Sequence, residues 1–176
     1  MGHDEPERQR TLGVTIQPVE DRQKLMEEYL GAWNDRDAER IASFFSDDAV
    51  YEDHGAGATA RGREGIRDHA ARVHAGFPDL HFELVRAAHG RDFTAGEWRS
   101  VMTHGGDFEG LAATGRMVES SGVDVATLDE DGQIVRLDSY YDGAAIMRAL
   151  GLLPARGSRV ERVLVRAASL LRRRLA

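Results

Sequence analysis

The spacing of apolar residues divides the chain into a helical part and a strand-rich part. Between residues 20 and 78 apolar side chains recur every three or four positions, as in Leu25, Tyr29 and Trp33, which is typical of amphipathic helices. Pro78 ends this part, because proline lacks the amide hydrogen that a helix needs. The pattern predicts helices over residues 20–34, 38–45 and 62–77, a strand over 49–52 and a glycine- and alanine-rich loop over 55–60.

After Pro78 the chain is rich in strand-forming residues, with apolar and polar positions alternating as in half-buried strands. Asp131-Gly132 is a strong hairpin-turn signal, and Asp142 caps a short closing helix that stops at Gly151. Helices followed by a meandering sheet indicate an α+β fold, in which the helices cover one face of a curved antiparallel sheet. The predicted strands span residues 80–88, 93–104, 117–128 and 134–141.

The two ends of the chain differ from this central domain, which spans residues 20–153. Residues 1–19 are polar, contain Pro6 and Pro18 and show no periodicity, so we expect a flexible N-terminal arm. Residues 154–176 combine apolar residues at helical spacing with many arginines. We therefore expect a basic, amphipathic C-terminal helix appended to the domain.

The composition and the net charge of the chain exclude several kinds of functional site and partner. The chain has no cysteine, which excludes disulfides, thiolate nucleophiles and zinc–thiolate sites. The formal net charge is −7, but residues 156–176 hold seven arginines and one glutamate, which leaves −13 for residues 1–155. Such an acidic body argues against binding of nucleic acid. Because the sequence shows neither a long apolar stretch nor a signal peptide, we expect a cytoplasmic protein.

A series of short motifs between about Lys24 and Leu153 occurs in a characteristic order. In this order the chain resembles the SnoaL-like polyketide cyclases, a family of the nuclear-transport-factor-2-like (NTF2-like) superfamily. The motifs are Trp33–Asp37, Tyr51–His54, Gly62–Ile66, Phe77–Leu80, Thr103–Gly106, Gly110–Arg116, Asp131–Ile134, Tyr140–Asp142 and Leu150–Gly151.

The resemblance implies a cone-shaped α+β barrel, open at one end, that encloses an apolar pocket. It implies homodimers formed through the outer face of the sheet, and a polyketide-like ketone as substrate. In such cyclases a carboxylate removes a C–H proton and the ring closes by an aldol reaction without a cofactor. The same scaffold hosts isomerases, hydroxylases, dehydratases, epoxide hydrolases and binding modules, so the fold alone does not define the function.

The residue at the family's catalytic aspartate position is Ser139 in this chain, and a neutral hydroxyl is a poor base. The resemblance places Asp124 at the position of the cyclases' partner imidazole. If Asp124 faces the pocket between Val123 and Val125, desolvation raises its pKa toward the range useful for proton transfer. We therefore predict Asp124 as the acid/base residue. The alternative is that Asp124 faces outward while the two valines fill the core.

Two histidines and six further residues complete the predicted site. His104 shares strand parity with Trp98 and is predicted to look into the pocket, unless it only stabilises the following glycine turn. His54 is predicted as a polar group of the pocket, with capping of a loop as the alternative. No metal is expected, because metal-ligand spacings such as His-x-His are absent. The predicted substrate-binding residues are Trp33, Phe77, Trp98, Met102, Ser139 and Tyr141.

Several functions remain open at this point. The first is cofactor-independent acid/base chemistry, namely cyclisation, isomerisation or hydroxylation of a polycyclic ketone. The second is binding of a small molecule without catalysis, and the third, ranked lower, is epoxide hydrolysis with Arg99 as a participant. For the C-terminal helix we favour packing on the acidic body or on a dimer partner over contact with an anionic membrane surface.

Overall fold

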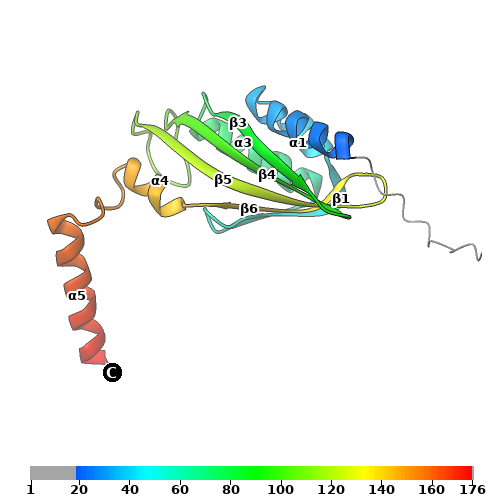
Figure 1. Ribbon diagram of the computed structural model, residues 1–176. Helices are drawn as coiled ribbons and strands as arrows, with labels where there is room; N and C mark the ends of the chain where they lie inside the picture. Colours follow the sequence, from blue (N-terminus) through cyan, green and yellow to red (C-terminus); the bar gives the residue numbers. More distant parts are fainter. Residues whose placement is uncertain (1–18, 176) are drawn as a thin grey trace, which may run out of the picture.

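The computed structural model describes residues 19–175, with helices on one side of a single curved sheet (Figure 1). The predicted N-terminal arm lies outside these residues, except for Val19. The helices are α1 (Val19–Asn34), α2 (Ala38–Ser43), α3 (Gly62–Gly76), α4 (Gly143–Ala149) and α5 (Arg159–Leu175). The strands are β1 (Phe45–Asp53), β2 (Ala58–Arg61), β3 (His81–His89), β4 (Phe93–Thr103), β5 (Met117–Leu128) and β6 (Ile134–Tyr141).

Local sequence signals explain most of these bounds. The Asp142 carboxylate accepts a hydrogen bond from the Ala145 amide at 2.9 Å and begins α4, as a helix cap does. Two predictions were wrong. Phe45 begins β1 rather than ending α2, and the segment predicted as a loop over 55–60 contributes to the short strand β2, which pairs with β1.

The sheet has the strand order β2-β1-β6-β5-β4-β3 and is not closed into a barrel. Four of its neighbouring pairs are antiparallel, among them the pair of β1 with the unpredicted β2, whereas β1 and β6 run parallel. The parallel pair joins the first strand to the last one, so the intervening elements form the long crossover that a parallel pair requires. The α+β fold with a curved sheet is confirmed.

The core lies between the sheet and helices α1, α2 and α3. Helix α1 packs on β3 and β4, and α3 packs on β1 and β2, while α4 lies near β5. Fully buried side chains such as Tyr29, Phe45 and Ile66 fill the space between the layers. Helix α5 projects away from this body, at the end of the chain drawn in red (Figure 1).

Candidate active site

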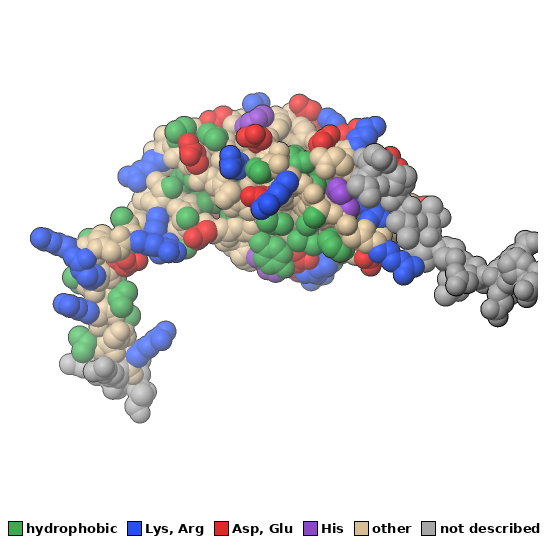
Figure 2. All heavy atoms as spheres, viewed as in Figure 1, with side chains coloured by type: hydrophobic (Ala, Val, Ile, Leu, Met, Phe, Trp, Pro, Cys, Tyr) green, Lys and Arg blue, Asp and Glu red, His purple; other side chains and the backbone are tan. Residues whose placement is uncertain are grey.

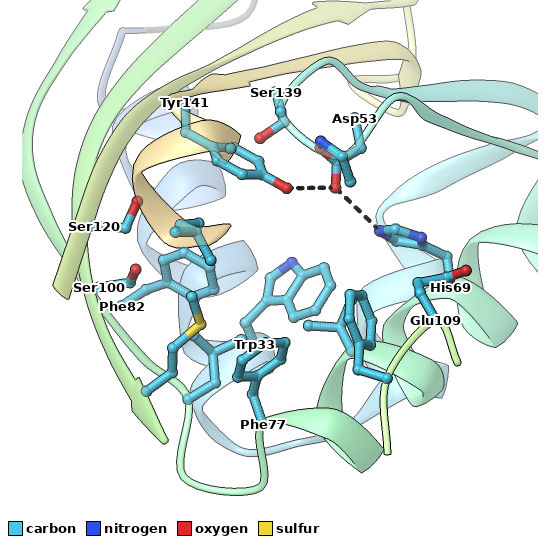
Figure 3. A pocket seen from close by; sticks show the side chains of 18 of the residues that line it. Trp33, Asp53, His69, Phe77, Phe82, Ser100, Glu109, Ser120, Ser139 and Tyr141 are labelled. Atoms are coloured by element: carbon cyan, nitrogen blue, oxygen red, sulfur yellow. Dashed lines mark hydrogen bonds and ion pairs between the residues drawn. The ribbon is translucent and has the colours of Figure 1, made fainter. Parts of the chain in front are cut away.

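A cavity of about 460 Å³ lies between the sheet and the helices. This volume falls in the range of small-molecule sites. Aromatic and aliphatic side chains make up most of its wall, with a few polar groups on the sheet side (Figure 3). The polar and charged lining residues are Asp53, His69, Ser100, Glu109, Ser120, Asp124, Ser139 and Tyr141.

Three of these polar residues form one row across three neighbouring strands. Ser139 on β6 lies in register with Asp53 on β1 and with Asp124 on β5. Residues directly opposite one another in a sheet point to the same face, and here that face lines the cavity. Adjacent strands are about 4.8 Å apart, which places the two carboxylates on either side of the serine, about 10 Å apart at their Cα atoms.

Asp124 is buried, with 4% of its surface exposed. Its carboxylate accepts a hydrogen bond from the Trp98 indole N–H at 2.9 Å. Burial raises the pKa of Asp124 to about 6, against the lowering effect of hydrogen bonds from Ser139 and Trp98, and the charge of Asp53 adds to the increase. The alternative of an outward-facing Asp124 is wrong, because its neighbour Val123 is the partly exposed residue and Asp124 lines the cavity.

Asp53 forms a second polar cluster on the other side of Ser139. Its carboxylate accepts hydrogen bonds from the Tyr141 hydroxyl at 3.0 Å and from the Ala56 amide at 2.8 Å. The His69 Nε2 atom lies 3.9 Å from the same carboxylate (Figure 3). Burial lowers the pKa of His69, although the charge of Asp53 acts in the opposite direction. The imidazole is therefore largely neutral near pH 7.

Asp53 and His69 were not among the predicted site residues, although the sequence contains signals for both. Asp53 has the strand parity of the buried residues Ala49 and Tyr51. His69 follows Ile66 by three positions and therefore lies on the apolar face of α3. A polar residue on a predicted buried face was the available indication of a site.

The backbone at Gly55 leaves room for the aromatic ring of Tyr141. A Cβ atom on Gly55 would overlap the Tyr141 ring, so only glycine leaves room for the ring at this point. The Tyr141 hydroxyl can therefore reach Asp53 from β6. Burial and the neighbouring Asp53 raise the pKa of Tyr141, which keeps its hydroxyl protonated and able to donate.

All six predicted substrate-binding residues line the cavity, as does Asp124. They are Trp33, Phe77, Trp98, Met102, Ser139 and Tyr141. Their roles in binding stay predictions.

The structure corrects the placement of the two predicted histidines, neither of which lines the cavity. His104 is fully buried behind Phe77, and its Nδ1 accepts a hydrogen bond from the Thr114 amide at 3.3 Å. His54 lies on the opposite face of the sheet, where it contacts Asp138 at 2.8 Å and stacks on Tyr140. His104 is buried like Met102, whose strand parity it shares, but it packs against Phe77 instead of reaching the cavity. His54 alternates with the buried Asp53, and this alternation puts it on the outer face.

The charged side chains of the cavity are acidic or imidazole groups. None of the described residues that line it is an arginine or a lysine, and Arg99 is exposed elsewhere. An epoxide hydrolase site with Arg99 is therefore not formed. Within residues 19–175 no three histidine, aspartate or glutamate residues are grouped to hold a metal ion.

The open sheet, the helical cover and the acidic cavity define an NTF2-like domain. The chain belongs to the SnoaL-like polyketide cyclase family, whose model matches residues 23–150. No curated protein sequence matches the chain.

Solved structures show the same fold. AclR from Streptomyces galilaeus, a candidate hydroxylase, is 24% identical, with a TM-score of 0.69 over 89% of this chain and 98% of its own. IdmH from Streptomyces antibioticus, a candidate polyketide cyclase, is 25% identical, with a TM-score of 0.62 over 73% of this chain and 97% of its own. A protein from Catenulispora acidiphila with a ketosteroid isomerase-like fold is 21% identical, with a TM-score of 0.65 over 77% of this chain and 97% of its own.

Proposed function

We propose that the protein is an enzyme that moves protons on a polyketide-like or polycyclic ketone without a cofactor. The observation that carries this proposal is the carboxyl of Asp124, buried in an apolar cavity with its pKa raised to about 6. A base with a pKa near the working pH is both ionised often enough and strong enough to take a carbon-bound proton. The family supports cyclisation of a polyketide as the overall reaction. Isomerisation, and hydroxylation in which O₂ as the oxidant reacts with the substrate carbanion, would use the same proton removal.

The proposed first step follows from the placement of the groups. The Asp124 carboxylate removes a proton from a carbon next to the ketone, and the electron pair moves onto the ketone oxygen as an enolate. Ser139 and Tyr141 line the same wall, and their hydroxyl protons turn from the carboxylates of Asp124 and Asp53 toward that oxygen as negative charge moves onto it. The enolate carbon then attacks a second carbonyl of the substrate, or takes the proton back at another carbon.

The Asp53 cluster supports the proton balance of this step. A proton that leaves the substrate on one side of Ser139 must return to a product oxygen or carbon, and Asp53 with the neutral His69 offers a second acid/base group. Two carboxylates on one wall of the cavity, on either side of Ser139, would therefore act on one substrate that the aromatic side chains hold against them.

Exchange of C–H protons for deuterium tests the proposal without knowledge of the natural substrate. The probe is 2-tetralone in D₂O, followed by NMR. We expect the protein to accelerate exchange next to the ketone, and Asp124→Asn to lower the rate about 10²- to 10⁴-fold. The matched control is Asp138→Asn, the same substitution on the outer face of the sheet, which should leave the rate unchanged. Equal rates for Asp124→Asn and wild type would remove Asp124 from the mechanism.

A second candidate function is binding of a ketone without chemistry. Ser139, which stands where the family resemblance places the catalytic aspartate, is the observation that favours it. This candidate predicts that 2-tetralone quenches tryptophan fluorescence through Trp33 and Trp98 while deuterium exchange proceeds at the rate of buffer alone.

A further inference from the structure

Helix α5 exposes its apolar residues to solvent. The helix projects from the body, and Figure 2 shows hydrophobic and Lys/Arg side chains alternating along it. Large apolar side chains on a surface helix normally pack against a partner. Val160, Val163, Leu164, Val165 and Leu170 are between 54% and 63% exposed.

The side chains of α5 are sorted by chemistry around the helix. At 100° per residue, the exposed Val160, Val163, Leu164 and Leu170 fall on one side. Arg159, Arg162 and Arg166 fall together on an adjoining flank, centred about 100° from the apolar residues, and Val165 lies on the side opposite to them. Over residues 159–175 the sequence has six arginines and one glutamate. Such a helix, with a strong apolar face, a cationic face and low overall hydropathy, is the kind that lies in a membrane interface.

The carboxylates of the body do not neutralise the positive charge of α5. The ion pair that joins the two is between Arg148 of α4 and Glu161 at 3.7 Å, so it uses the acidic residue of α5 and a cation of the body. In the described structure Arg159, Arg162 and Arg166 pair with no carboxylate. The expectation that α5 packs on the acidic body is therefore not what the chain adopts.

A second copy of the chain is also a poor match for α5. The outer face of the sheet has partly exposed apolar residues, Val101 and Val123 among them. However, charges of both signs border these residues: Glu119 lies opposite Val101, Glu97 lies opposite Val123 and is paired with Arg86, and Arg99 is exposed on the same strand. A stripe flanked by arginines needs an apolar surface bordered by negative charge alone, which an anionic phospholipid layer provides and this mixed face does not.

We propose that α5 docks the protein on anionic phospholipid membranes. The apolar stripe enters the boundary between head groups and acyl chains, while the arginines contact lipid phosphates. Docking through α5 would leave the folded domain outside the lipid. None of the described helices is long and apolar enough to cross a membrane.

The position of α5 relative to the cavity gives this docking a consequence. Met147 of α4 lines the cavity and is 37% exposed, which places it at the opening. Leu152 and Leu153, each 39% exposed, continue the apolar surface toward α5. A ketone dissolved in the bilayer would meet the opening close to the membrane surface. This consequence rests on the proposed function, whereas the docking does not.

Flotation of the full chain with lipid vesicles tests the proposal in the absence of any ketone. Vesicles of phosphatidylcholine alone are compared with vesicles that contain about 30% phosphatidylglycerol, a negative surface of the kind that attracts basic segments. We expect binding to the anionic vesicles that weakens as salt is raised. Binding to neutral vesicles should be about tenfold weaker or more.

Two substitutions separate the apolar stripe from charge. Val163→Asp and Val165→Asp place the same charge two positions apart, at side chains that are 63% and 60% exposed, but on opposite sides of the helix. Val163→Asp should lower the bound fraction about tenfold, and Val165→Asp less than about twofold. Circular dichroism confirms that both variants keep the helix.

Three outcomes would overturn the proposal. They are no binding to anionic vesicles, equal loss in the two variants, and an oligomer that Val163→Asp dissociates while vesicles bind neither form. The last outcome would assign the stripe to a protein partner. Because no substrate enters the experiment, its failure leaves the proposed catalytic function untouched.

Discussion

The titration of Asp124 links the cavity to the stability of the fold. An exposed aspartate titrates at about 3.9, whereas burial raises the pKa of Asp124 to about 6. Between these values the folded protein holds the proton and the unfolded chain does not. This group's contribution to the free energy of unfolding is therefore greatest at or below about pH 4 and is lost as pH rises through 6.

Asp124→Asn should remove this dependence. The stability of the variant relative to wild type should increase from pH 4 to pH 7 by on the order of 3 kcal/mol, because the asparagine carries no charge to bury. Urea unfolding at the two pH values measures the difference. The stability of Asp138→Asn relative to wild type should instead decrease with rising pH, because Arg136, and to a lesser extent His54, lower the pKa of Asp138. If the difference in unfolding free energy between Asp124→Asn and wild type were the same at both pH values, Asp124 would not be desolvated.

Individual site residues were predictable where a regular strand carries them. Alternation along β6 put Tyr141 on the face of Ser139, whereas the family resemblance selected Ser139 and Asp124 and left both orientations of Asp124 open. Alternation along β1 puts His54 on the face opposite to Asp53, so the prediction of His54 as a pocket residue did not follow from strand periodicity. The contact between Asp53 and His69 joins a strand to a helix across the cavity, and no spacing in the sequence encodes that distance.

At the scale of elements, Gly122 of β5 leaves room for the Trp98 side chain of the neighbouring strand β4. A Cβ atom at Gly122 would lie 2.5 Å from Trp98 Cζ2 and 2.5 Å from the Tyr140 carbonyl oxygen. The indole ring can therefore lie flat over this strand and donate to Asp124. The backbone of one strand thus sets the position of the hydrogen-bond donor on the next.

Gly122→Ala should displace the Trp98 ring and cost about 1–3 kcal/mol of unfolding free energy, as overpacking does. Loss of the indole hydrogen bond, which lowers the pKa of Asp124, should raise that pKa further. Unfolding in urea and NMR titration of the carboxyl measure the two effects.

Gly31→Ala is the matched control, because open space surrounds that glycine within α1. This variant should have the stability of wild type or exceed it by up to about 1 kcal/mol. Equal stability of the two variants would contradict the packing argument.

The predicted ends of strands were most accurate where the hydrophobic pattern and a turn signal agree. β5 and β6 have the predicted ends, and Asp131-Gly132 lies between them. β2 was missed because it has only four residues and its apolar positions are alanines, which are poor strand formers. The parallel pairing of β1 with β6 was missed for another reason. Strand order depends on packing between distant segments, which periodicity does not describe.

At the scale of the whole molecule, the outer face of the sheet is a candidate dimer interface. The helices cover only the other face, and Val101, Val123 and Tyr140 are 44%, 36% and 47% exposed on the outer one. Val123 and Tyr140 lie opposite each other on neighbouring strands and form a continuous apolar patch. We propose that two copies bury this patch against each other.

Light scattering should give a mass of twice 19.4 kDa for the wild type. Val123→Arg should yield monomers, because it places a charge in the centre of the patch. Leu152→Asp, at an apolar residue of similar exposure outside the sheet, should not change the mass. A wild-type mass of 19.4 kDa at micromolar concentration would contradict the proposal.

The row formed by Asp53, Ser139 and Asp124 has a consequence for how such proteins diversify. Three neighbouring strands present one side chain each to the same cavity, at steps of about 4.8 Å. Two substitutions in this row, one that removes a carboxyl and one that introduces it on the next strand, move the carboxyl by one strand and leave the backbone as it is. Under the proposed function, the carboxyl would then take its proton from a different carbon of a bound ring system, so a new reaction is two point mutations away.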